Sequence, residues 1–86
     1  MSRVSDVLGQ ALVTDFGVAP EALDPAATLE DLALDSLELA ELCDILGTGL
    51  GIRVEDRDLS LRTTLGQAVA VLEAKVDGTV SRESRL

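Results

Sequence analysis

The sequence has no histidine, tryptophan or tyrosine, and Phe16 is its only phenylalanine. Without histidine, the chain lacks the residue that most often acts as a general base, and His-based triads and His-dependent metal sites are excluded. The shortage of aromatic rings argues against stacking on bases or sugars. Lys and Arg together number 7 against 16 Asp and Glu, which gives a formal charge of −9. Because such a chain repels phosphate backbones, we expect no binding to nucleic acid.

Cysteine and long apolar segments are equally scarce. A single cysteine, Cys43, cannot form an internal disulfide, which suits a reducing cytoplasm. The longest apolar run, residues 68–72, is far too short to cross a bilayer, and the first residues contain no apolar signal segment. With 86 residues, of which 47% are apolar, the chain can build one small core. We expect a single cytoplasmic domain that is monomeric, spans no membrane and works through partners.

The negative charge is concentrated in the middle of the chain. Residues 21–58 contain eleven acids and only two basic residues, Arg53 and Arg57, whereas acids and bases balance in the two flanks. A charge run of this kind is often no more than a solvated face. Its concentration in one segment favours a docking surface for partner proteins with basic patches.

The apolar spacing predicts an all-α fold, a small four-helix bundle with three longer helices and one short one. We expect the first helix at about residues 3–16 and the second to begin near Asp35, which forms a capping box with Glu38. Asp56 is expected to cap a short third helix that carries Leu59 and Leu61. Thr64 and Gln67 form another capping box, at the start of the last helix.

A long loop, residues 18–34, separates the first two helices because Pro20 and Pro25 keep most of it from being helical. A loop of this length should be anchored by packing, and four leucines are expected to do so: Leu23, Leu29, Leu32 and Leu34. Gly78 is expected to end the last helix, so that residues 1–78 form the domain and residues 79–86 a flexible polar tail. Cys43 lies on the apolar stripe of the second helix and is predicted to be a small core residue rather than a nucleophile.

Ser36 is the candidate for carrying chemistry. It stands at the start of the second helix, where a phosphate attached to its hydroxyl would lie near free N–H groups and the positive end of the helix dipole. The simpler interpretation is that Ser36 only helps Asp35 to cap the helix. Leu37 lies on the face opposite the apolar stripe, among acidic residues, and suggests an apolar anchor within an electrostatic docking patch. The predicted patch consists of Leu37, Glu38, Glu41 and Asp44.

Residues 32–38, LALDSLE, resemble the phosphopantetheine attachment motif of acyl carrier proteins, and the resemblance extends over about residues 3–77. It implies a free-standing, non-catalytic carrier whose Ser36 receives 4′-phosphopantetheine, derived from coenzyme A, from a phosphopantetheinyl transferase. It further implies that Asp35 helps to present this site to the transferase. Acyl groups would travel on the arm as thioesters between acyl-loading, condensing and tailoring enzymes with basic docking surfaces. Leu46 and Val69, from two apolar stripes, are candidates for lining a space that shelters the acyl chain.

The pathway is less clearly indicated. Fatty-acid carriers usually have a bulky apolar residue at the position of Asp44, and often acids and an aromatic at those of Gly47, Gly49 and Leu50. A dedicated polyketide-type or related pathway is therefore favoured, with general fatty-acid synthesis as the alternative. A different class of function, an acidic helical adaptor without a cofactor, also fits the composition. The absence of histidine argues against a third class, a small hydrolase.

Overall fold

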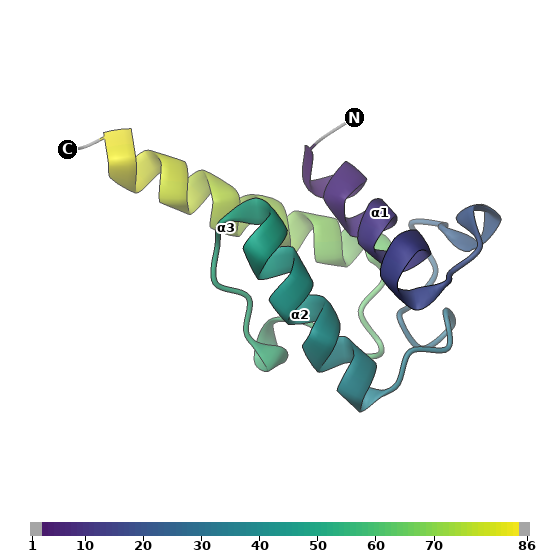
Figure 1. Ribbon diagram of the computed structural model, residues 1–86. Coiled ribbons are helices and arrows are strands. Elements are labelled where there is room, and N and C mark those ends of the chain that lie inside the picture. The colour runs from purple at the N-terminus through teal and green to yellow at the C-terminus, as the bar shows by residue number, and fades with distance from the viewer. Residues whose placement is uncertain (1–2, 85–86) are drawn as a thin grey trace.

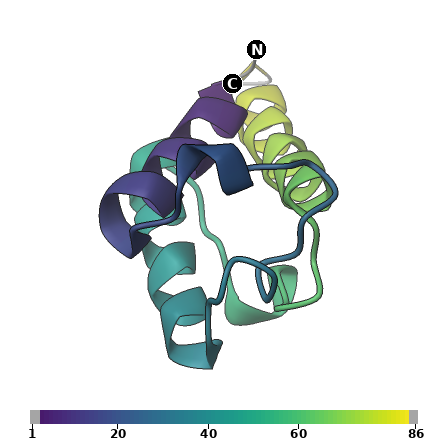
Figure 2. The same cartoon turned by 90° about the vertical axis from the view of Figure 1, so that its right-hand side faces the viewer.

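The computed structural model describes residues 3–84, and within them the side chains of residues 3–78. These residues form three α-helices, α1 (Arg3–Phe16), α2 (Ser36–Leu50) and α3 (Leu65–Ser84), and two short 3-10 turns, η1 (Pro20–Ala22) and η2 (Asp56–Asp58). The all-α class is confirmed, and α1 has the predicted bounds. In Figures 1 and 2 the start of α2 lies at the opposite end of the molecule from the start of α1 and the end of α3. None of the helices in the described range is long and apolar enough to span a membrane.

The core is aliphatic and is built from all three helices and the long loop. Its largest fully buried side chains are Leu12, Leu29, Leu42, Leu46, Leu72 and Cys43, and none of the polar or charged side chains in the described range is buried. At the ends of the helices, Arg3 donates a hydrogen bond from Nη2 to the carbonyl of Gly49 at 3.3 Å. This contact joins the start of α1 to the end of α2, where a positive charge is favoured by the helix dipole.

The predicted short third helix is only the 3-10 turn η2, so the count of four helices is not confirmed within the described residues. Its cap is Glu55 rather than Asp56. The Glu55 N–H donates to Asp58 Oδ2 at 2.8 Å, and the Asp58 N–H donates to the Glu55 carbonyl at 2.9 Å, which closes a single turn. Leu59 then leaves the turn in an extended conformation and is buried in the core. Leu59 therefore lies in the core and not on a second helical turn.

The expectation that Gly78 ends the last helix was also wrong, because α3 continues through it to Ser84. A glycine inside an exposed helix costs about 1 kcal/mol relative to alanine, which weakens a helix without stopping it. The end of α3 extends away from the body of the molecule (Figure 1). Of the predicted tail, residues 85–86 lie outside the described residues, and the division into domain and tail stays a prediction.

The long loop is anchored as predicted. Leu29 and Leu34 are buried, and Leu23 and Leu32 pack against the core. The loop is also paired by backbone hydrogen bonds with the segment that leads into α3, through an isolated bridge between Thr28 and Thr64 and the bonds around it. The Leu29 N–H donates to the Thr63 carbonyl at 3.1 Å, and the Leu65 N–H donates to the Ala27 carbonyl at 2.9 Å.

Candidate functional site

The first turn of α2 is fixed by a reciprocal pair of hydrogen bonds, as its sequence predicts. The Glu38 N–H donates to Asp35 Oδ1 at 2.8 Å, and the Asp35 N–H donates to Glu38 Oε1 at 3.2 Å. Asp35 itself is extended, with φ −107° and ψ −178°, and its carbonyl accepts the first helical hydrogen bond from Leu39 at 2.9 Å. The cap of α2 is therefore provided by Asp35, and the Ser36 hydroxyl is not needed for it.

Ser36 is the first residue of α2, and its side chain is exposed. The N–H groups of Ser36 and Leu37 lie in the first turn, where no preceding turn can supply a carbonyl partner. They form the partially positive end of the helix. A phosphodiester on the Ser36 oxygen would therefore meet backbone donors and solvent rather than the core, so these residues fit a phosphopantetheine group.

Leu37 is 71% exposed and is the one large apolar side chain that the described residues leave in solvent. Glu41 and Asp44 are also exposed, and their spacing of four and seven residues from Leu37 places the three on one face of α2. The structure thus brings together three of the four predicted docking residues. Glu38 differs from them because it is half-buried and its carboxylate accepts the Asp35 N–H.

Cys43 lies on the opposite face of α2 and is buried, as predicted, with 1% of its surface exposed. Burial raises the pKa of its thiol to about 11, and the negative charges of Asp56, Asp58 and Asp44 act in the same direction. Its Sγ contacts the Glu55 carbonyl oxygen at 3.8 Å. The thiol is therefore protonated at neutral pH and unsuited to nucleophilic attack.

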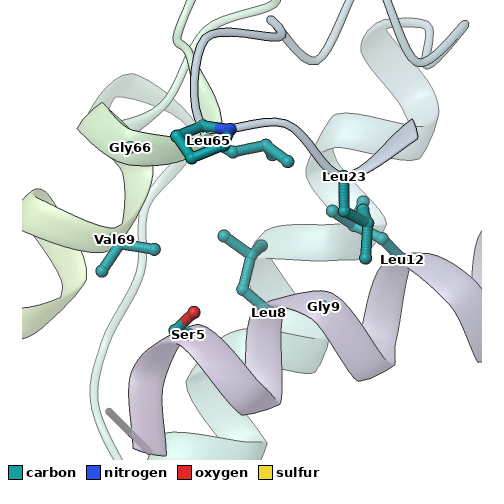
Figure 3. A pocket seen from close by; sticks show the side chains of 9 residues that line it. Ser5, Leu8, Gly9, Leu12, Leu23, Leu65, Gly66 and Val69 are labelled. Carbon is teal, nitrogen blue, oxygen red and sulfur yellow. The ribbon is translucent and has the colours of Figure 1, made fainter. Parts of the chain in front are cut away.

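An apolar pocket of about 310 Å³ opens between α1, the loop around residue 23 and the start of α3 (Figure 3). Of the two residues predicted to line an acyl shelter, Val69 lines this pocket, whereas Leu46 is fully buried in the core and is not part of its lining. The sequence alone did not indicate the other lining residues, which are Ser5, Leu8, Gly9, Leu12, Leu23, Pro25, Leu65 and Gly66. The available signal was Gly9, a residue without a side chain that directly follows Leu8 of the apolar stripe.

Comparisons with known proteins also indicate a phosphopantetheine group. The sequence profile of a family described as the phosphopantetheine attachment site matches residues 6–72. An acyl carrier protein of Saccharopolyspora erythraea is 38% identical over 76 residues, which cover 87% of this chain and 77% of that protein. An acyl carrier protein of Nitratidesulfovibrio vulgaris is 30% identical over 73 residues, covering 84% of this chain and 96% of that protein.

A third relative, an acyl carrier protein of Thermotoga maritima, is 29% identical over 75 residues, covering 87% of this chain and 89% of that protein. No solved structure gives a significant match. The matched residues 6–72 include the whole of α2 with its capping box, the long loop and the start of α3. The chain therefore belongs to the acyl carrier protein family, in which the attached cofactor is 4′-phosphopantetheine.

Proposed function

We propose that Ser36 is the attachment site and that the chain carries acyl groups on its arm between biosynthetic enzymes in the cytoplasm. Attachment would join the Ser36 oxygen to the phosphorus that bears the pantetheine in coenzyme A. The bond from that phosphorus to the adenosine bisphosphate breaks, and the hydroxyl proton leaves to a base. Since the chain has no histidine, that base would come from a separate phosphopantetheinyl transferase. The terminal thiol of the arm supplies the thioester linkage to the acyl cargo.

The observation that carries this proposal is the exposed Ser36 hydroxyl at a helix start whose capping is already provided by Asp35 and Glu38. A serine in that position contributes little to the fold, and its hydroxyl is accessible to another protein. The same geometry supports the proposed role of Asp35 in presenting the site to the transferase. By capping the helix, Asp35 fixes the backbone of the residue next to it.

Intact-mass measurement after incubation with coenzyme A and a promiscuous transferase tests the site. The wild type should gain one phosphopantetheine group, and Ser36→Ala should gain none. Ser5→Ala, which removes the hydroxyl of another exposed helical serine, is the matched control and should be modified like the wild type. Modification of Ser36→Ala would place the attachment elsewhere. An unmodified but folded wild type would support the alternative function, an acidic adaptor without cofactor.

We further propose that Leu37, Glu38, Glu41 and Asp44 form the docking side of α2, with Leu37 as the apolar anchor and the acids facing arginine or lysine of the partner. The exposure of Leu37 supports this arrangement, because burial of such a side chain in a partner's pocket contributes about 1.5–3 kcal/mol. Glu38 would contribute mainly by fixing the helix start on which the other three depend.

For the pathway, we propose a dedicated polyketide-type or related route rather than general fatty-acid synthesis, on the basis of Asp44. Its carboxylate is exposed on the docking face where fatty-acid carriers usually have an apolar residue. Gly47 has a different explanation, since an added Cβ would lie 2.9 Å from the Ile52 carbonyl oxygen. Its small size is required by the fold and says nothing about partners.

Replacement of the essential fatty-acid carrier in a bacterial depletion strain tests this choice. The wild-type chain, although modified, should not restore growth. Asp44→Leu should improve transfer of an acyl group by a fatty-acid ketosynthase, and Glu21→Leu, an exposed acid away from α2, is the matched control. Full restoration of growth by the wild type would favour the fatty-acid alternative.

A further inference from the structure

Ala33 has a backbone conformation that its residue type disfavours. Its φ is +67°, and it is the one non-glycine residue in the described range with a positive φ. The other two residues with positive φ are Gly17 and Gly51, which follow α1 and α2. In the left-handed region the Cβ of an L-residue crowds the following carbonyl oxygen, so an alanine stays there only where its surroundings hold it.

The surroundings of Ala33 form a single helical turn with a cap at each end. At its start, the Thr28 N–H donates to Asp31 Oδ2, and the Asp31 N–H donates to Thr28 Oγ1, both at 3.0 Å. At its end, the Ala33 N–H donates to the Glu30 carbonyl at 2.9 Å, and the Leu34 N–H donates to the Leu29 carbonyl at 3.2 Å. This pair of bonds is the Schellman arrangement, in which the left-handed residue is usually glycine.

The turn is itself held in place by the rest of the fold. Leu29 is fully buried, and the N–H of Glu30 donates to the Leu61 carbonyl at 2.8 Å in the segment before α3. Immediately after Ala33, Leu34 returns to the core with 6% of its surface exposed. The chain then passes through extended Asp35 to Ser36.

Two structural features therefore fix the position of Ser36. The capping box fixes it from the α2 side, and the left-handed turn at Ala33 fixes it from the loop side, with only Leu34 and Asp35 between them. If Ala33 adopted the right-handed or extended conformation, the direction of the chain after it would change. Leu34 and Asp35 could then not both keep their places.

We propose, on the basis of the proposed attachment at Ser36, that Ala33 is a positioning residue for that modification. Its left-handed conformation places the Ser36 oxygen where a transferase with bound coenzyme A can reach it. Transfer to phosphorus requires the attacking oxygen in line with the leaving group, and a misplacement of about 1 Å can lower a rate by up to about a hundredfold. The side chain of Ala33 is exposed, so the backbone conformation of residue 33 matters rather than its packing.

The test uses substitutions that differ in their preference for the left-handed region. Gly and Asn accept it, whereas the β-branched Val does not. Ala33→Gly and Ala33→Asn should be modified with the wild-type kcat, and Ala33→Val should lose about tenfold in kcat with KM little changed, because the docking face of α2 is intact. Ala70→Val, the same change at an exposed position of α3, is the matched control and should behave like the wild type.

Amide NMR shifts of Ser36 and Leu37 give a second measurement on the unmodified chain. The shifts of these two amides should differ from the wild type in Ala33→Val and match it in Ala33→Asn. The amide shifts of α1 should be unchanged in both variants. If Ala33→Val does not fold, Ala33→Thr, which is also β-branched and is close to Asn in size, takes its place. Equal slowing by Asn and Val would show that bulk at the transferase contact matters, and it would overturn the proposal.

Failure of this inference is distinct from failure of the proposed function. Wild-type kcat in a folded Ala33→Val variant would refute the positioning role while leaving Ser36 as the attachment site. Modification of Ser36→Ala would refute the attachment site itself, whatever the Ala33 variants do.

Discussion

A saturated acyl chain on the arm should enter the apolar pocket and raise the melting temperature of the protein. The pocket of about 310 Å³ is within the size range of small-molecule sites, and five of its lining residues are Leu or Val. An eight-carbon acyl group has six methylenes, and each one removed from water contributes about 0.8 kcal/mol, or roughly 5 kcal/mol together. Parting the helices and ordering the arm offset much of this gain. A remainder of about 1–2 kcal/mol would raise the Tm of a domain this small by about 4–16 °C.

Val69→Phe, which puts a larger side chain at the pocket, tests whether the rise in melting temperature comes from binding of the acyl chain in this pocket. The Tm difference between the octanoyl form and the bare-arm form should shrink in Val69→Phe and persist in Val71→Phe. Val71 lies on the same helix, is similarly half-buried and does not line the pocket. A short polar acyl group should leave the Tm of the wild type unchanged.

The Tm values of the octanoyl and bare-arm forms, measured by calorimetry in the wild type and both valine variants, have three informative outcomes. An unchanged Tm and unchanged core NMR shifts in the octanoyl form would refute the shelter and leave the cargo in solvent or with the partner enzyme. A Tm gain that both valine variants keep would place the cargo elsewhere in the bundle, and the predicted lining residue Leu46 would then be the next position to test. A gain lost only in Val69→Phe would confirm the pocket.

Other predictions concern the charges and the thiol. Removal of the α2 cap in Asp35→Ala should lower the free energy of unfolding by about 0.5–2 kcal/mol, as measured by denaturant titration. The bond from the Glu55 N–H, followed by the bond from Lys75 at 2.9 Å, lowers the pKa of Asp58. Stability from Asp58 is therefore present above its unfolded-state pKa of about 3.9 and lost as pH falls through the lower folded-state value, so Asp58→Asn should flatten the acid end of the stability profile. Glu41→Lys should slow association with partners, and the wild-type association rate should fall with added salt; indifference to both would exclude electrostatic docking. Alkylation of Cys43 at neutral pH should proceed only at the rate at which the protein opens, since the thiol is buried and its pKa is about 11.

Local sequence signals predicted the elements whose stabilising contacts are also local. The bounds of α1 followed from its apolar stripe. The starts of α2 and α3 were predicted from two capping boxes. In the capping box of α3, the Thr64 N–H donates to Gln67 Oε1 at 3.0 Å, and the Gln67 N–H donates to Thr64 Oγ1 at 3.1 Å. Such pairs span three residues, so their pattern is visible in the sequence before any tertiary contact is known.

Features that depend on distant segments were not predictable in this way. The segment predicted as a short third helix instead makes contacts with distant parts of the chain, through the burial of Leu59 and the ion pair between Asp58 and Lys75. The left-handed conformation of Ala33 carries no signal in its residue type, because glycine is the usual choice there. The pocket forms between segments around residues 8, 23 and 69, which only the fold brings together.

The described side chains separate polar and apolar interactions in a way that suits a carrier. At the start of α2, Asp35 and Glu38 close a polar network at the surface. In the core, no polar or charged side chain of the described residues is buried. Parting the helices therefore exposes mainly aliphatic surface, and an apolar cargo that enters covers surface of the same kind, so no buried polar or charged side chain loses its partner. Because the network at Ser36 takes no part in that opening, Ala33→Val should slow attachment of the arm without altering the Tm gain from the cargo. Val69→Phe should reduce the Tm gain without slowing attachment.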